Sequence, residues 1–170
     1  MQTQWSKMKK RLEDSICDKL KGRVEYFATS YRHAHDGQGR VCILVDKKEI
    51  INMPFSNNGE INQEIINLHE KANKPYKEIY KEACNNKALE GVFSTWIFAY
   101  AYDEFCVKTI EECLNSDNLL VKLIAFIDKR TGYRTLIKFK NRIVELPEWL
   151  QYFYNLRLQT YKMQNKKTAI

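Results

Sequence analysis

The sequence predicts one α+β domain: an N-terminal helix, an antiparallel β-hairpin sheet, and a predominantly helical C-terminal two-thirds packed on that sheet. Three observations carry this prediction. Apolar residues recur at helical spacing near the start of the chain, two β-rich segments flank a glycine-containing turn, and helical periodicity then continues almost to the end. No fixed-period repeat and no Gly/Ser/Pro-rich linker divides the 170 residues, so residues 1–170 are expected to form one domain.

The first helix is expected over residues 3–20, followed by Gly22. Its apolar stripe recurs at steps of three and four residues and consists of Trp5, Met8, Leu12, Ile16 and Leu20. Gly22 is expected to close the helix, because glycine readily adopts the left-handed conformation found at helix ends.

Two strands are expected next, over residues 23–34 and 40–53. The intervening HDGQGR supplies two glycines of the kind that a tight hairpin loop needs. If residues 36–39 are a four-residue loop, the strands pair antiparallel with Asp46 opposite Thr29. The second strand begins with consecutive apolar residues, which predicts that both of its faces are covered.

Helical periodicity resumes after a loop at residues 54–60. It predicts a helix over residues 61–72 and another from Pro75, a good first-turn residue, to about residue 85. Ser94 is expected to cap the very apolar helix that follows.

The remaining helices are placed by their capping residues and breaks. Thr109 with Glu112 forms the spacing of a capping box, and Asp117 or Asn118 can cap the next apolar helix. Gly132 is expected to break that helix.

The segment from Tyr133 to Val144 fits both a helix and a strand, and helix is the preferred interpretation. Pro147 then starts a final helix, and residues 164–170 are expected to be a frayed polar tail.

The net charge of +7 is unevenly distributed along the chain. Residues 128–170 hold ten Lys/Arg and three Asp/Glu, and residues 1–24 hold seven and three. Residues 60–117 instead hold six Lys/Arg and eleven Asp/Glu. The basic ends could attract a polyanion, or they could attract the acidic middle within one chain or between two copies in a homo-oligomer.

Five cysteines without a CxxC spacing do not suggest a disulfide framework or a zinc knuckle. No apolar run approaches the length of a membrane span, and the N-terminus lacks the apolar stretch of a signal peptide. These features favour a cytoplasmic protein that does not enter a membrane.

Several segments resemble a small family of uncharacterised, hypothetical bacterial proteins. They are WSKMKKRLEDSICDKLKGRVEYFATSYR, GQGRVCILVDKKEI, LNSDNLLVKLIAFIDKRTGYRTL and YFYNLR, and the likeness is weakest around residues 57–103. The family has no established function, so the resemblance implies a bacterial cytosolic protein and transfers no functional residues.

One constellation resembles metal-dependent nucleases of the restriction type. Asp46 and Lys48 would share one face of a strand, and Glu25 on the neighbouring strand could complete a Mg²⁺ site in which the lysine helps activate a water. Asp36 would lie too far from Asp46 to share one ion. The competing interpretation is a solvated, charged cluster that protects the end of a strand.

A weaker metal candidate is the pair His33 and His35, which would share a strand face beside Asp36 and could bind Zn²⁺ or Ni²⁺. Cys42 would stand opposite His33 in the expected register. Histidines at the surface beside a turn are the default interpretation.

The basic C-terminal part supplies the candidate binding residues, Arg130, Arg134, Lys138, Lys140, Arg142 and Arg157. The cluster around Gly132 could hold an anion, or Asp128 could pair with Arg130 or Arg134 and fix the corner. Aromatic residues interleave with basic ones in the last helix, as in surfaces that bind single-stranded nucleic acid, but their spacing also fits a core.

The leading hypothesis is a non-catalytic binding or interaction protein, without a cofactor, whose basic C-terminal face meets an acidic partner, either protein or nucleic acid. The alternatives are a metal-dependent nuclease using Glu25, Asp46 and Lys48 with Mg²⁺, and nucleic-acid binding without cleavage. No convergent catalytic set is visible in the sequence, which leaves the question of enzymatic activity open and favours binding.

Overall fold

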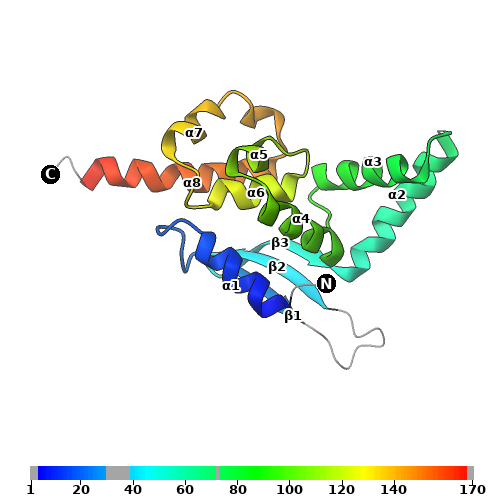
Figure 1. Ribbon diagram of the computed structural model, residues 1–170, viewed down its shortest axis with the longest axis horizontal. Helices are drawn as coiled ribbons and strands as arrows, with labels where there is room; N and C mark the ends of the chain where they lie inside the picture. Colours follow the sequence, from blue (N-terminus) through cyan, green and yellow to red (C-terminus); the bar gives the residue numbers. More distant parts are fainter. Residues whose placement is uncertain (1–3, 30–38, 72, 168–170) are drawn as a thin grey trace.

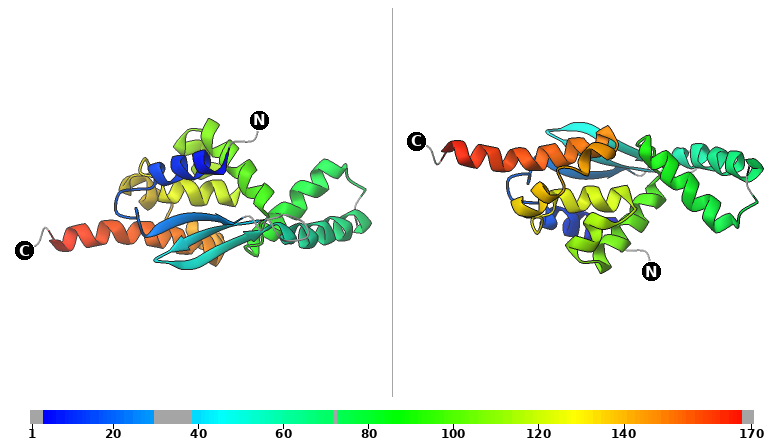
Figure 2. Two further views of the ribbon diagram at one scale, coloured as in Figure 1. Left: turned by 90° about the horizontal axis from the view of Figure 1, so that it is seen from below. Right: turned by 90° about the horizontal axis from the view of Figure 1, so that it is seen from above.

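The structure, a computed structural model, describes residues 4–29, 39–71 and 73–167 (Figure 1). An N-terminal helix precedes a three-stranded antiparallel sheet, and the rest of the described chain is mostly helical. This confirms the predicted α+β class. Figure 2 shows helices α1 and α4 on the same side of the sheet.

Helix α1 (Trp5–Ser15) buries the predicted apolar stripe against the sheet and α4. Met8 and Leu12 are buried, and the Trp5 ring lies 6.3 Å from that of Phe98. The helix ends five residues earlier than expected, because the backbone at Ile16 pairs with Asp128 in an isolated β-bridge. Gly22 has a φ of +76° and turns the chain into β1.

The sheet consists of β1 (Val24–Thr29), β2 (Arg40–Val45) and β3 (Lys48–Pro54), in that order. The prediction of one strand over residues 40–53 is wrong, because the chain reverses at Asp46 and Lys47. Both residues have positive φ, 50° and 66°. This conformation belongs to the tight turns that match the twist of a β-hairpin.

The predicted pairing of the first two strands is also wrong. Val24 lies opposite Val45 and Thr29 lies opposite Arg40, so the register is shifted by six residues from the one expected. Cys42 lies opposite Phe27 rather than His33. The glycines of HDGQGR did not fix the register of the two strands, and residues 35–38 of this segment lie outside the described residues.

Helices α2 (Asn58–Lys71) and α3 (Tyr76–Leu89) form an antiparallel pair that projects from the body of the molecule, here called the arm (Figure 1). α2 begins three residues earlier than expected, directly after a short 3-10 helix, η1 (Phe55–Asn57). The arm has a small core separate from the main one, formed by Ile61, Ile65, Ile79 and Ala83.

Three helices form the centre of the fold: α4 (Thr95–Val107), α5 (Ile110–Asn115) and α6 (Leu119–Ile127). Every residue of α6 is buried. The Thr109–Glu112 capping box is confirmed, and Asn118 rather than Asp117 caps α6 by accepting from the Leu120 N–H.

The ambiguous segment after Gly132 is helical, as preferred. It forms α7 (Tyr133–Lys138) and a 3-10 turn, η2 (Ile143–Glu145). The last helix, α8 (Glu148–Lys167), extends past Met163, where the tail was expected to begin. α8 packs against α6, with the Phe126 and Tyr154 rings 5.6 Å apart.

Candidate functional site

The residues of the nuclease hypothesis lie at the β2–β3 turn and on the neighbouring strand. The Arg23 guanidinium donates to both Asp46 carboxylate oxygens, at 2.8 and 2.7 Å, and holds the pKa of that carboxyl below its ordinary value. Glu25 is paired with Lys47. Lys48 begins β3, and its side chain is exposed.

This arrangement has consequences for the proposed chemistry. The nuclease hypothesis requires Asp46 and Lys48 to lie on one strand and to point to the same face of the sheet. Asp46 instead lies in the turn before β3, so this requirement is not met. Each of the two carboxylates already has a basic partner, and the two ion pairs join the turn to Glu25 of β1 and to Arg23 directly before it. Among the described residues, no group of three or more His, Cys, Asp or Glu is placed to hold a metal ion. The candidate ligands His33 and His35 lie outside the described residues.

Two of the predicted binding residues make hydrogen bonds within the fold, and one of them, Arg130, keeps 48% of its side chain exposed. Asp128 is fully buried, and it accepts two bonds from the Arg130 side chain, at 3.0 and 2.9 Å, and one from the Arg130 backbone N–H. This confirms the structural interpretation of that corner. Arg157 is only 4% exposed and donates to the carbonyl of Thr131 at 2.8 Å, so it joins α8 to the same corner.

The other four predicted binding residues lie at the surface around α7. Arg134, Lys138, Lys140 and Arg142 are exposed, and Arg142 donates to Asn115 on α5 at 2.9 Å. Exposed apolar side chains come from the same stretch of the chain. We call this the α7 surface, formed by Tyr133, Arg134, Ile137, Lys138, Lys140 and Val144.

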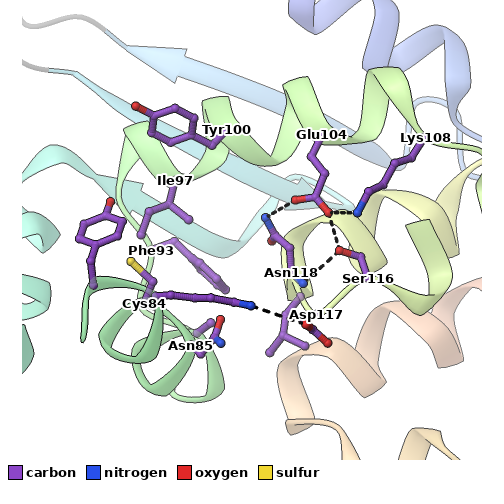
Figure 3. Close-up of a pocket in the computed structure, with 14 residues that line it drawn as sticks. Cys84, Asn85, Phe93, Ile97, Tyr100, Glu104, Lys108, Ser116, Asp117 and Asn118 are labelled. Atoms are coloured by element: carbon purple, nitrogen blue, oxygen red, sulfur yellow. Dashed lines mark hydrogen bonds and ion pairs between the residues drawn. The ribbon is translucent and has the colours of Figure 1, made fainter. Parts of the chain in front are cut away.

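A cleft of about 610 Å³ lies where the arm meets the body (Figure 3). One wall is α3, the other is α4 with the α5–α6 loop, and Phe93 from the α3–α4 connection also lines it. The apolar part of the lining comprises Ala88, Phe93, Ile97 and Leu119. Tyr80 and Tyr100, both exposed, come from the two facing helices.

Glu104 organises the polar wall of the cleft. Its Oε1 accepts from the Lys108 ammonium at 2.6 Å and the Ser116 hydroxyl at 2.5 Å, and its Oε2 accepts from the Asn118 amide at 3.3 Å. Burial opposes ionisation, but these hydrogen bonds outweigh it and keep the pKa of Glu104 below its ordinary value. Glu104 is therefore an anion at neutral pH.

The remaining polar groups of the cleft come mainly from α3. Burial raises the pKa of Tyr80 to about 12 and also raises the pKa of the neighbouring Cys84 thiol. Both groups are therefore neutral at physiological pH. The Lys81 ammonium lies 3.9 Å from the Asp117 carboxylate across the cleft, and both side chains are largely exposed.

The sequence did not reveal this cleft, because its lining residues come from three separate segments between Tyr80 and Leu119. Only the sequential proximity of Ser116, Asp117 and Asn118 could have indicated a polar loop. That signal was interpreted as helix capping, and Asn118 does cap α6. The pairing of Glu104 with this loop depends on how α4 packs beside α6.

In the part of the chain that the structure describes, no helix has the length and apolar character needed to cross a membrane. A search of curated proteins and a search of solved structures each found no match to the sequence. A family model does match, over residues 4–158, and it describes the SF0329 protein family. The match covers the sheet, the arm and the helical body, so the chain belongs to the uncharacterised SF0329 protein family.

Proposed function

We propose that this protein is a non-catalytic binding protein whose α7 surface docks an acidic segment of a partner protein. The observation that carries the proposal is the composition of that surface. Arg134, Lys138 and Lys140 are exposed, and among the described residues none of them has a carboxylate within ion-pair distance. Their charges are therefore directed at solvent or a partner.

The apolar residues of the α7 surface favour a protein partner over a nucleic acid. Val144 is 72% exposed, and Tyr133 and Ile137 are also exposed. Aliphatic side chains have no counterpart on a phosphate backbone, whereas exposed apolar and basic residues from one stretch of the chain fit a protein segment that combines carboxylates with apolar side chains.

Buried side chains and a hydrogen bond to α8 anchor the α7 surface to the core. Leu136, Phe139 and Ile143 point inward and are buried, and the Tyr154 hydroxyl donates to the Leu136 carbonyl at 2.9 Å. The Arg142 guanidinium lies 4.5 Å from the centre of the Phe139 ring. A prearranged surface loses little conformational entropy when a partner binds.

We also propose that the protein is cytoplasmic, because the reducing conditions there keep cysteines as free thiols. All five are free thiols.

The test is a binding titration with a short labelled peptide that carries glutamates and leucines at helical spacing. We expect wild-type protein to bind it, and the variant R134Q/K138Q/K140Q to bind about tenfold more weakly, because exposed charge pairs each contribute up to about 1 kcal/mol. The loss should shrink as salt is added, since salt screens exposed charges.

The matched control is K10Q/K71Q/K77Q, which removes three exposed positive charges from α1 and the arm. It should leave the affinity for the peptide unchanged. Equal weakening by both triple variants would show a general charge effect and contradict the proposed docking surface. Tighter binding of duplex DNA or single-stranded RNA than of the peptide would replace the proposal with nucleic-acid binding.

A further inference from the structure

The cleft between the arm and the body has the features of a small-molecule site, and the α7 surface takes no part in it. We propose that it binds a free α-amino acid with a large apolar side chain. A volume of about 610 Å³ falls within the range of ligand pockets, which combine apolar walls with a few placed polar groups.

The charge balance of the lining points to a ligand with no net charge that carries both signs. Two cations, Lys81 and Lys108, and two anions, Glu104 and Asp117, line the cleft. A ligand with a single charge would leave that charge uncompensated in a site whose own charges already balance. A zwitterion can pair with one cation and one anion of the lining at the same time.

The ligand ammonium would bind at Glu104. Oε1 of this carboxylate is engaged by Lys108 and Ser116, whereas the only partner of Oε2 among the described residues is the Asn118 amide at 3.3 Å. An ionised carboxylate oxygen accepts more than one hydrogen bond, so Oε2 retains capacity for a cation.

The ligand carboxylate would bind at Lys81. Its contact with Asp117 spans 3.9 Å between two largely exposed side chains, and a pair of this kind contributes little stability. The Lys81 ammonium can therefore turn to a new anion at small cost. Figure 3 shows Asp117, the present partner of Lys81, beside Ser116 and Asn118 of the α5–α6 loop.

The apolar side chain of the ligand would contact Phe93, Ile97 and Leu119. Phe93 is held in place from behind, because the Trp149 ring lies 5.2 Å away in an edge-on contact. The Trp149 indole N–H donates to the Ala88 carbonyl at 3.0 Å, so this wall is fixed to α8. Tyr100 would cover the ligand from the α4 side.

The test compares three probes that share one phenyl-bearing body: L-phenylalanine, phenethylamine, which lacks the carboxylate, and 3-phenylpropionate, which lacks the ammonium. Each is titrated into the full chain by calorimetry and by ligand-observed NMR. We expect L-phenylalanine to bind, and each analogue to bind about tenfold more weakly or worse, because each loses a hydrogen-bonded charge contact.

Two variants assign each charge to its residue. Lys81→Gln should weaken L-phenylalanine and 3-phenylpropionate but not phenethylamine, whereas Glu104→Gln should weaken L-phenylalanine and phenethylamine but not 3-phenylpropionate. The controls are Lys77→Gln, one turn earlier on α3, and Asp103→Asn, beside Glu104 on α4; both are exposed and outside the lining. Neither control should change any affinity.

Three outcomes would overturn the proposal: no binding of L-phenylalanine up to millimolar concentration, equal binding of the three probes, or variants that behave like their controls. If Glu104→Gln fails to fold, as judged by circular dichroism, the outcome rests on Lys81→Gln, which alters an exposed side chain and leaves the Glu104 network intact. Because Lys81 and Glu104 lie outside the α7 surface, a negative result here leaves peptide docking at α7 unaffected.

Discussion

At the scale of single residues, Arg157 shows how a basic side chain can stabilise the fold instead of a complex. Its guanidinium donates to the Thr131 carbonyl, the Thr160 hydroxyl and the Tyr161 hydroxyl. It also lies 4.7 Å from the centre of the Tyr161 ring. We expect Arg157→Ala to lower the free energy of unfolding by about 2–3 kcal/mol, because buried hydrogen bonds to a charged group are lost.

Urea unfolding measures this effect, with Arg134→Ala as the exposed control, which should stay within about 0.5 kcal/mol of wild type. Arg157→Lys should recover only a small part of the loss, because an ammonium cannot reach three acceptors as the planar guanidinium does. Full recovery by lysine would show that charge rather than geometry matters.

The two kinds of arginine could not be told apart in the sequence. Arg130, Arg134 and Arg157 all fall in the basic C-terminal part, and each was predicted to bind a partner. Only the fold shows that Arg130 donates to the Asp128 carboxylate and that Arg157 donates to the Thr131 carbonyl. The pairing of Asp128 with Arg130 or Arg134 was one of the two interpretations that the sequence supported, because an acid inside a basic cluster usually pairs with a neighbour, and the structure shows the pair with Arg130.

Glu104 gives the fold a defined dependence on pH. Its folded pKa lies below the ordinary value of 4.5, so the stability that its ionised form contributes is complete above 4.5 and is lost as pH falls through the folded pKa. We expect Glu104→Gln to destabilise the protein near neutral pH. The difference from wild type should narrow below pH 4.5 in urea titrations, and a constant difference would contradict this role.

At the scale of elements, the β2–β3 turn contains strain that a substitution can relieve. Lys47 has a φ of 66°, a conformation that costs residues with a side chain about 1 kcal/mol relative to glycine. Lys47→Gly should therefore stabilise the protein by about 0.5 kcal/mol, since the exposed ion pair with Glu25 offsets part of the gain. The control is Lys48→Gly, one residue later in β3. Thermal unfolding should show that this second variant is less stable than wild type.

Two helix caps that look alike in sequence differ in the structure. The Thr109 hydroxyl accepts from the Glu112 N–H at 3.3 Å, whereas the Ser94 hydroxyl is buried and has no hydrogen-bond partner among the described residues. We expect Thr109→Ala to cost about 1 kcal/mol and Ser94→Ala to cost almost nothing in urea unfolding. Equal losses would show that the Ser94 hydroxyl also caps its helix.

Element types were predictable where the apolar period was long, as in α1 and α6. The sequence failed where a turn used residues other than glycine or asparagine. Asp46 and Lys47 lie within a β-rich run, so the run was interpreted as one strand. The error misplaced Asp46 and Lys48 and gave the nuclease hypothesis a shared strand face that does not exist.

At the scale of the whole molecule, the arm and the body have separate cores, so we expect them to unfold separately. Ile79→Ala, within the arm's own cluster, should speed amide hydrogen exchange in α2 and α3 while leaving α6 protected. Leu123→Ala, in the main core, should speed exchange throughout. If Ile79→Ala exposed α6 equally, the molecule would be a single cooperative unit.

The cleft could not be predicted from single residues or single elements, because it exists only where the arm joins the body. Each lining segment has a local explanation as helix or cap. Their convergence on Glu104 and Lys81 depends on the angle at which α3 leaves the body, and no local pattern encodes that angle.

The bridge between Ile16 and Asp128 bears on how the protein is made. The Cys17 N–H donates to the Ile127 carbonyl at 2.9 Å, and the Lys129 N–H donates to the Ser15 carbonyl at 2.8 Å. During translation, the first helix and the hairpin leave the ribosome long before α6 does. Part of their apolar surface therefore has no packing partner until α6 has been synthesised, and exposed apolar surface of this kind makes a partly synthesised chain prone to aggregation.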